Sequence, residues 1–291
     1  MTWVVQYFLP GAVIAIMFAV GLDLAPRDFA RVFKYPRAAL VGLTGQLVFL
    51  PALGFLLAML VKDDPTLAIG IILLAACPGG VTSNMVSYLA RAHTALSVSF
   101  TAVTSVVSFI TIPLIVNWGL AAFGEPGAEI RLPVLATMEK VFLLTILPVL
   151  VGMSLRALLP GLVGRIEPYL QRVSSLLLIA ILGVIFTLNW DLFIEQFWRY
   201  APFAVAMTMV AGGAGYFAAK AAGLDRRDKF TISIEVGFQN ISLAQLIAAT
   251  ILGKPEYGLL AAIYPFANWV PLLPWLLYFR HRSNTLAAGE A

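Results

Sequence analysis

Residues 232–245 read ISIEVGFQNISLAQ and place a carboxylate, Glu235, with three carboxamides in an otherwise apolar segment. At the centre of a membrane helix a carboxylate costs about 2.5–3.5 kcal/mol on insertion scales, so such a residue is a functional-site hypothesis by default. Gly237 lies among the polar residues, and a glycine suits a place where a helix is interrupted. The stretch therefore predicts a broken membrane helix that holds a polar site.

The composition of the whole chain agrees with a membrane protein. Of 291 residues, 60% are hydrophobic and 12% are charged, whereas a soluble domain carries roughly a quarter charged residues. Apolar runs of about twenty residues recur, and each is long enough to cross a bilayer as a helix. The net charge of +4 is explained by basic residues in cytoplasmic loops and does not indicate a nucleic-acid partner. The fold class is therefore an all-α integral membrane protein.

Nine transmembrane helices are predicted from the apolar runs. They cover residues 3–22, 36–60, 66–90, 94–118, 134–156, 170–189, 200–222, 228–252 and 257–279. Turn signals agree with these limits, because Asp64-Pro65 is typical of a helix cap and first turn, and Pro160-Gly161 is typical of a connection. Residues 24–35 mix basic and apolar side chains and predict a short helix along the headgroups.

The basic residues predict the orientation of the chain. Connections that follow odd-numbered spans hold 14 Lys and Arg residues, and those that follow even-numbered spans hold 5. Because basic loops face the cytoplasm, the N-terminus is expected outside and the C-terminus inside, in the inner (plasma) membrane.

Two polar interruptions divide the chain into related halves. Residues 77–84, CPGGVTSN, interrupt the third span, and residues 235–240, EVGFQN, interrupt the eighth. The third and eighth spans cross the membrane in opposite senses, and each interruption has one span before it and one after it. Two broken helices at corresponding places in an inverted repeat indicate the binding site of a secondary transporter.

The polar residues in and near these breaks suit a sodium ion. A hard cation in a membrane needs a cage of oxygens, which amides, hydroxyls, a carboxylate and freed backbone carbonyls can supply. Ser97 and Thr101 are four residues apart and lie on one helix face, and Gln46 lies inside the second span. Taken alone, Ser97 and Thr101 have a packing interpretation, because Ser and Thr in membrane helices often bond back to a carbonyl or mediate close packing, and a single Gln46 more often forms a hydrogen bond between helices. Glu235 has no such ordinary interpretation.

The motifs resemble those of the bile acid:sodium symporter family. Its members carry Pro-Gly-Gly-x-x-Ser-Asn and Glu-Val-Gly-x-Gln-Asn breaks in two crossing helices, as this chain does at 78–84 and 235–240. The resemblance extends over nearly the whole chain, from about residue 14 to 269, and includes the spacing to Ser97 and Thr101. It implies two bound sodium ions and a small organic anion, bile-acid-like or a small carboxylate, as the transported substrate.

The resemblance also implies which residues bind each ligand. The first sodium would be held by Ser83, Asn84, Ser97, Thr101 and Glu235. The second would be held by Gln46, Gln239, Glu235 and the backbone carbonyls of Val236 and Phe238. The anion would lie near Thr82, Asn240 and Asn268.

The family fold implies two domains. Residues 36–118 and 200–279 would form a core transport domain, and residues 3–22 and 134–189 a panel domain. Because the family fold has ten helices, the chain is expected to be a bacterial-type member without the first panel helix. Neither the oligomeric state nor the identity of the anion follows from the sequence.

The function that the sequence favours is sodium-coupled import of an organic anion by alternating access, not catalysis. A sodium/proton antiporter is an alternative, but it commonly needs paired carboxylates, and the site offers Glu235 alone. An intramembrane enzyme would need a nucleophile with a base, and Cys77 has no histidine at membrane depth, since His93 lies in a connection. A non-transporting sensor or channel is a further alternative.

Overall fold

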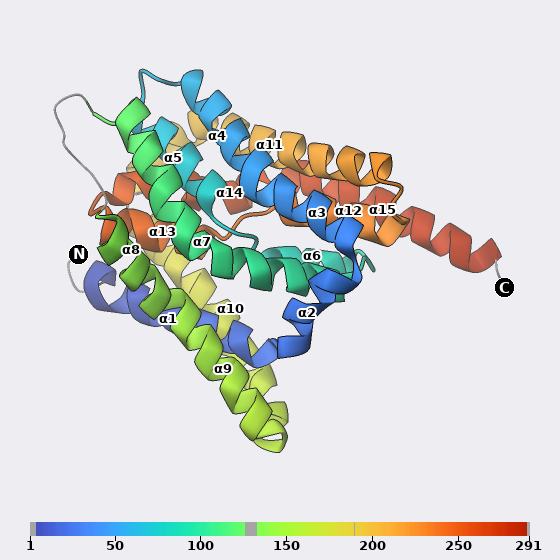
Figure 1. Cartoon of the computed structure of the whole chain (residues 1–291). Coiled ribbons are helices and arrows are strands. Elements are labelled where there is room, and N and C mark those ends of the chain that lie inside the picture. The colour runs from blue at the N-terminus through green and yellow to red at the C-terminus, as the bar shows by residue number, and fades with distance from the viewer. Residues whose placement is uncertain (1–3, 126–132, 189, 290–291) are drawn as a thin grey trace.

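The chain is helical along nearly all of its described length (Figure 1). The computed structural model describes residues 4–125, 133–188 and 190–289, and no β-strand occurs in these ranges. The α-helices in chain order are α1 (Leu9–Asp23), α2 (Pro26–Lys34), α3 (Pro36–Thr44), α4 (Leu50–Met59), α5 (Pro65–Ala76), α6 (Val81–Leu89), α7 (Thr94–Phe123), α8 (Val134–Val141), α9 (Leu147–Leu158), α10 (Pro160–Leu188), α11 (Trp190–Ala221), α12 (Arg226–Gly237), α13 (Ile241–Leu246), α14 (Leu259–Ala267) and α15 (Trp269–Gly289). The all-α prediction is confirmed.

Seven helical segments among the described residues are long and apolar enough to cross a membrane. They are Gln6–Asp23, Pro36–Met59, Thr94–Phe123, Val134–Leu158, Phe193–Ala221, Arg226–Ile251 and Pro255–Phe279. The predicted span 66–90 is instead divided into α5 and α6, because the chain leaves the helix at Cys77. The predicted span 170–189 corresponds to the second part of α10, which begins ten residues earlier at Pro160 and ends at Leu188; residue 189 lies outside the described residues.

Caps and short helices follow the turn signals of the sequence. The side chain of Asp64 accepts a hydrogen bond from the backbone N–H of Leu67 at 3.1 Å, which confirms the predicted cap before Pro65. Residues 24–35 contain α2, where Asp28 accepts a bond from the backbone N–H of Ala25 at 2.8 Å. The predicted short helix is therefore present.

Wide π-type turns occur just before prolines inside three of the long segments. These turns are η1 (Val4–Phe8), η2 (Gly45–Phe49) and η3 (Phe142–Ile146), and a Leu-Pro pair follows each one. A proline has no N–H and its ring clashes with the carbonyl four residues back, so the regular ladder cannot continue through it. The wider turn changes the hydrogen-bond register just before the proline, because the N–H of Leu50 bonds to the carbonyl of Gly45, five residues back. Since η2 contains Gln46, this distortion falls at the predicted site.

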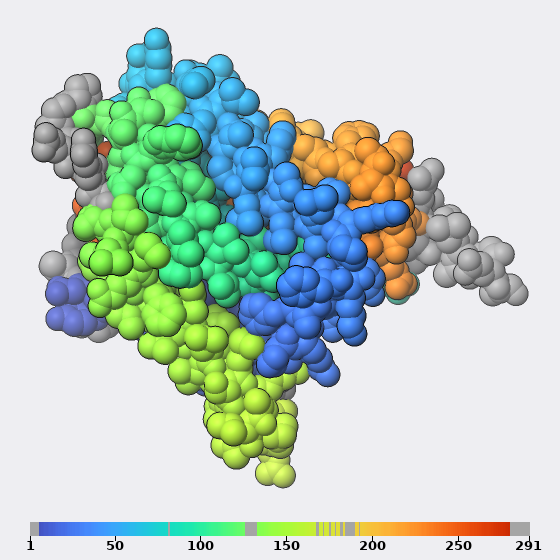
Figure 2. All heavy atoms as spheres, in the orientation of Figure 1, coloured from blue at the N-terminus to red at the C-terminus, as the bar shows by residue number. Residues whose placement is uncertain are grey.

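The main helix contacts position the two broken segments. α5 is buried from Leu67 to Ala76 and packs against α4 and α7, while α11 packs against α12 and α14. α1 packs against α9 and α10 and also contacts α13. Figure 2 shows one face of the molecule, made largely by the segments coloured blue to yellow-green, with the end of α9 projecting from it.

Small residues allow α1 and α9 to approach closely. A β-carbon on Gly21 would lie 2.3 Å from the carbonyl oxygen of Val149, and one on Gly152 would lie 2.4 Å from that of Phe18. Such contacts are typical of membrane helices that associate through small residues. Arg156 adds a hydrogen bond of 2.7 Å to the carbonyl of Leu22.

The Gly152→Ala variant is therefore expected to be less stable than the wild type by about 1–3 kcal/mol, because the added methyl group forces the two backbones apart. The measurement is a thermal melt of purified protein in detergent. Gly11→Ala on α1 is the matched control, since its β-carbon would meet nothing within 4 Å. Equal melting temperatures for the two variants would contradict the close α1–α9 contact.

Candidate functional site

The two helix breaks meet inside the molecule. Between α5 and α6 the backbone is extended at Cys77, with φ −74° and ψ 146°. Between α12 and α13 it is extended at Phe238, with φ −119° and ψ 121°. The backbone N–H of Asn240 donates to the carbonyl of Pro78 at 2.9 Å. Each break thus satisfies part of the other's freed backbone, as buried polar groups in a membrane require.

The two glycines of the first break allow the second break to approach closely. A β-carbon on Gly79 would lie 2.3 Å from Oε1 of Glu235, and one on Gly80 would lie 3.3 Å from Cα of Asn240. Gly79 therefore leaves the space that the carboxylate of Glu235 occupies. The Pro-Gly-Gly sequence therefore does more than bend the chain, because its glycines let the two breaks lie close together.

Oxygen atoms from α6 and α7 lie around the carboxylate of Glu235, which is on α12. The hydroxyl of Ser97 on α7 lies 2.8 Å from Oε2 of Glu235 and 2.8 Å from Oδ1 of Asn84 on α6. The hydroxyl of Thr101 lies 2.5 Å from Oε1 of Glu235 and 3.3 Å from the same Asn84 oxygen. Each hydroxyl has one proton and donates to one acceptor at a time. We call Asn84, Ser97, Thr101 and Glu235 the carboxylate cluster.

The carboxylate cluster is buried except for the half-buried Asn84, and none of its side chains is cationic. Glu235 is 1% exposed, and within the described residues it forms no ion pair with Lys, Arg or His. A buried charge without a partner is strongly unfavourable. Ser83 is also buried, and its hydroxyl donates to the carbonyl of Gly80 at 2.7 Å. It thereby stabilises the first break beside the cluster.

A second group consists of two carboxamides and a helix-end carbonyl. Nε2 of Gln46 donates to the carbonyl of Cys77 at 3.0 Å and to Oε1 of Gln239 at 2.8 Å. Nε2 of Gln239 in turn donates to the carbonyl of Val236 at 2.8 Å. The buried Oε1 of Gln46 accepts no hydrogen bond from the described residues. We call Gln46, Gln239 and Val236 the carboxamide cluster.

Glu235 belongs to the carboxylate cluster by its hydrogen bonds. Among the described residues, no hydrogen bond joins its carboxylate to Gln46 or Gln239. Phe238 turns its side chain into a packed group with Val86, Phe230 and Leu272. A ligand role for Phe238 would therefore rest on its backbone carbonyl.

A cavity of about 610 Å³ lies beside the crossed breaks. Its walls come from both breaks and from α1, α2, α6, α7, η3, α9, α10 and α13. Polar residues of the proposed sites that line it include Thr82, Asn84, Thr101 and Asn240. Of the described residues that line it, Asp23 carries the one formal charge, and none is Lys, Arg or His. The cavity thus adjoins the carboxylate cluster through Asn84 and Thr101.

A smaller cavity of about 110 Å³ is lined by Thr82, Gln239, Tyr264 and Asn268. Asn268 is 2% exposed, and neither polar atom of its amide forms a hydrogen bond with the described residues. Of the three residues expected near the anion, Thr82 and Asn240 line the larger cavity, while Asn268 lines the smaller one with Thr82. The Oδ1 atom of Asn240 also caps α13, accepting from the N–H of Leu243 at 3.0 Å.

A model of the sodium bile acid symporter family matches residues 10–196, more than half of the chain. The chain belongs to this family. The match includes the first break together with Ser97 and Thr101. Family membership places the chain among transporters and not among enzymes, and confirms the resemblance stated from the motifs.

Individual relatives agree with the family. The chain is 27% identical to an uncharacterized sodium-dependent transporter, YocS, of Bacillus subtilis, over 85% of this chain and 75% of that protein. It is 27% identical to the probable chloroplastic sodium/metabolite cotransporter BASS2 of rice, over 85% of this chain and 58% of the relative. It is also 27% identical to the probable chloroplastic sodium/metabolite cotransporter BASS1 of Arabidopsis thaliana, over 87% of this chain and 62% of the relative. The chain therefore spans less than two thirds of these plant proteins.

The second break is also held by a tyrosine that the sequence did not indicate as part of the site. The phenol of Tyr264 on α14 donates to the carbonyl of Gly237 at 2.5 Å, and the hydroxyl of Thr208 on α11 donates to the phenol oxygen at 3.1 Å. The available signal was a tyrosine inside the last predicted span. Nothing in its spacing distinguishes it from a tyrosine at the membrane interface.

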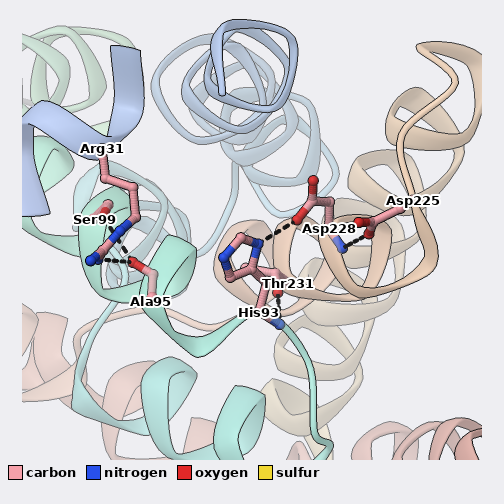
Figure 3. A network of polar contacts seen from close by, with 7 residues as sticks. All are labelled: Arg31, His93, Ala95, Ser99, Asp225, Asp228 and Thr231. Carbon is pink, nitrogen blue, oxygen red and sulfur yellow. Dashed lines mark hydrogen bonds and ion pairs between the residues drawn. The ribbon is translucent and has the colours of Figure 1, made fainter. Parts of the chain in front are cut away.

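A polar network also holds α7 against α12, the helices that carry Ser97 and Glu235 (Figure 3). Nδ1 of His93 lies 2.8 Å from Oδ1 of Asp228, and the His93 backbone N–H donates to the hydroxyl of Thr231 at 2.9 Å. Arg31 of α2 donates to the carbonyl of Ala95 at 3.0 Å. His93 therefore connects the start of α7 to α12 through both its ring and its backbone.

Proposed function

We propose that this protein imports an organic anion together with sodium. The observation that carries the proposal is Glu235, a buried carboxylate among hydroxyl and amide oxygens with no cationic side chain bonded to it in the described residues. A hard monovalent cation would neutralise this charge and accept those oxygens as ligands. Membership of a sodium symporter family supports the same ion.

Two sodium sites are proposed from the two clusters. Ser83 and the carboxylate cluster would hold the first ion, and the short distances among their oxygens support this. The carboxamide cluster, the Phe238 carbonyl and Glu235 would hold the second, and the unpaired Oε1 of Gln46 supports that site. An ion there would replace the amide hydrogen bonds of Gln46 and Gln239 with bonds to their oxygens.

The anion is proposed to bind across the larger cavity and the neighbouring smaller one, with Thr82 and Asn240 as its polar contacts in the larger cavity and Asn268 in the smaller one. The described lining offers no basic side chain, so the negative charge must be balanced otherwise. The N-terminus of α6 beside the first break carries a partial positive charge, and the sodium ions lie close by. An anion would then bind well when sodium is bound, which is the basis of coupling.

The proposal includes an architecture. Nine spans would form an inverted repeat, with residues 36–118 and 200–279 as the core and residues 3–22 and 134–189 as the panel. The extensive packing of α1 against α9 and α10 supports this division. Movement of the core against the panel would expose the larger cavity to each side in turn. The N-terminus would lie outside the inner membrane and the C-terminus in the cytoplasm.

The direct test is uptake by purified protein in proteoliposomes. A panel of labelled carboxylates and sulfonates is offered with sodium outside, and with potassium in its place as control. We expect at least one anion to accumulate above its outside concentration only with an inward sodium gradient. Equilibration without accumulation would indicate a channel, and sodium movement against protons without any anion would indicate an antiporter.

Uptake should also respond to voltage. Two sodium ions with one monovalent anion carry one net positive charge inward, and 100 mV, negative inside, then contributes about 2.3 kcal/mol to accumulation. A potassium diffusion potential of that sign is expected to accelerate uptake. Equal rates with and without the potential would argue for a neutral stoichiometry and against two filled sites.

A further inference from the structure

The carbonyl of Gly237 is the last of α12 before the second break. Carbonyls in the last turn of a helix have no partner within that helix. In a membrane protein such a group must be satisfied by another part of the protein or by a ligand. The Gly237 carbonyl accepts a hydrogen bond from a residue outside the break.

Tyr264 provides the bond. Its phenol donates to the Gly237 carbonyl at 2.5 Å, and Thr208 donates to the phenol oxygen at 3.1 Å. Tyr264 is 2% exposed and Thr208 is 6% exposed, so the chain of bonds is shielded from water. A β-carbon on Gly237 would lie 3.2 Å from Cα of Gly212, which shows how closely α11 supports the same turn.

This bond fixes the direction of the neighbouring carbonyls. Phe238 has extended backbone angles, φ −119° and ψ 121°, so the carbonyls of Gly237 and Phe238 point in roughly opposite directions. Because the Gly237 carbonyl is directed to Tyr264, the Phe238 carbonyl faces away from that phenol. The preceding carbonyl, that of Val236, already bonds to the carboxamide cluster through Gln239.

We infer that Tyr264 is a positioning residue for the second sodium site. By engaging the Gly237 carbonyl, it removes that oxygen from competition for the ion and holds the Val236 and Phe238 carbonyls in the arrangement that binds it. Tyr264 itself does not contact the ion. The inference rests on the proposed function, because it concerns the second of the two proposed sites.

The test compares three conservative variants in membrane vesicles. Tyr264→Phe removes the phenol hydroxyl, Thr208→Val removes the bond that orients it, and Tyr216→Phe on α11 is the matched control, since its ring packs against Trp275. The sodium concentration for half-maximal uptake should rise about tenfold in Tyr264→Phe, about threefold in Thr208→Val, and not in Tyr216→Phe. The Hill coefficient for sodium should fall toward 1 in Tyr264→Phe, with the anion KM at saturating sodium unchanged.

Each result bears on one claim. A wild type whose uptake ignores sodium overturns the proposed function itself. A sodium-dependent wild type with an unchanged sodium response in Tyr264→Phe overturns the role of Tyr264 alone, even if that variant melts earlier, because a purely structural role lowers stability without changing sodium affinity. If Tyr264→Phe does not insert, Thr208→Val decides, and an unchanged sodium response there overturns the inference.

Discussion

Gly79→Ala should abolish sodium-driven uptake while leaving the protein in the membrane. The added β-carbon would lie 2.3 Å from Oε1 of Glu235 and 3.4 Å from the hydroxyl of Ser83. Either the carboxylate must leave the cluster or the first break must shift, and both changes separate the oxygens that the first ion needs. We expect uptake to fall about 100-fold or more. The measurement is initial uptake in proteoliposomes at saturating sodium, corrected for the amount of inserted protein.

The matched control for this variant is Gly213→Ala. Gly213 lies within α11, and its β-carbon would meet nothing within 4 Å. This variant should transport at the wild-type rate and, because alanine favours helices over glycine, should be no less stable. Gly80→Ala should be intermediate, since its closest neighbour would lie 3.3 Å away. Wild-type transport by Gly79→Ala would show that the carboxylate does not need the position seen in the structure.

Glu235→Ala has the other large expected effect. It removes the one charge of the carboxylate cluster, and sodium-driven uptake should fall by about 100-fold or more. The protein should still insert, because the variant removes a charge that is costly to bury when no ion is bound. Glu235→Gln should retain partial activity, since it keeps an oxygen but loses the charge. Uptake is measured over a range of sodium concentrations for each variant.

Two further alanine variants distinguish the sites. Asn84→Ala removes an oxygen shared by Ser97 and Thr101 and should weaken mainly the first site. Gln46→Ala should weaken mainly the second. In each variant, uptake should depend less steeply on sodium concentration, because one site binds sodium weakly and the other binds it about as tightly as in the wild type. Loss of both components in either variant would mean that the clusters act as a single site.

Chemistry that is costly in a membrane could be predicted from the sequence. Glu235 and Pro78-Gly79-Gly80 are strong signals. A carboxylate is costly inside a membrane, and Pro-Gly-Gly interrupts the helix that would otherwise satisfy the backbone polar groups. The all-helical fold and the family follow from such signals. The division of the predicted span 66–90 into α5 and α6 was indicated by the break, whereas the early start of α10 at Pro160 was not.

Features that depend on contacts between distant segments could not be predicted. Tyr264 and His93 are ordinary residues for their places in the sequence, and their roles arise from partners at Gly237 and Asp228. The wide turn at Gln46 depends on how the chain accommodates Pro51, which the residue order does not specify. The close approach of Gly79 to Glu235 likewise needs the three-dimensional arrangement of both breaks.

Sodium binding at Glu235 is tested most directly by thermal-shift titration of purified protein, with sodium chloride against potassium chloride at equal ionic strength. A ligand that binds only the folded state stabilises it by RT ln(1 + [L]/Kd). We predict that the melting temperature of the wild type rises with sodium but not with potassium, and that Glu235→Ala shows little of this rise. A full sodium-specific shift in Glu235→Ala would contradict the assignment of its carboxylate as a sodium ligand.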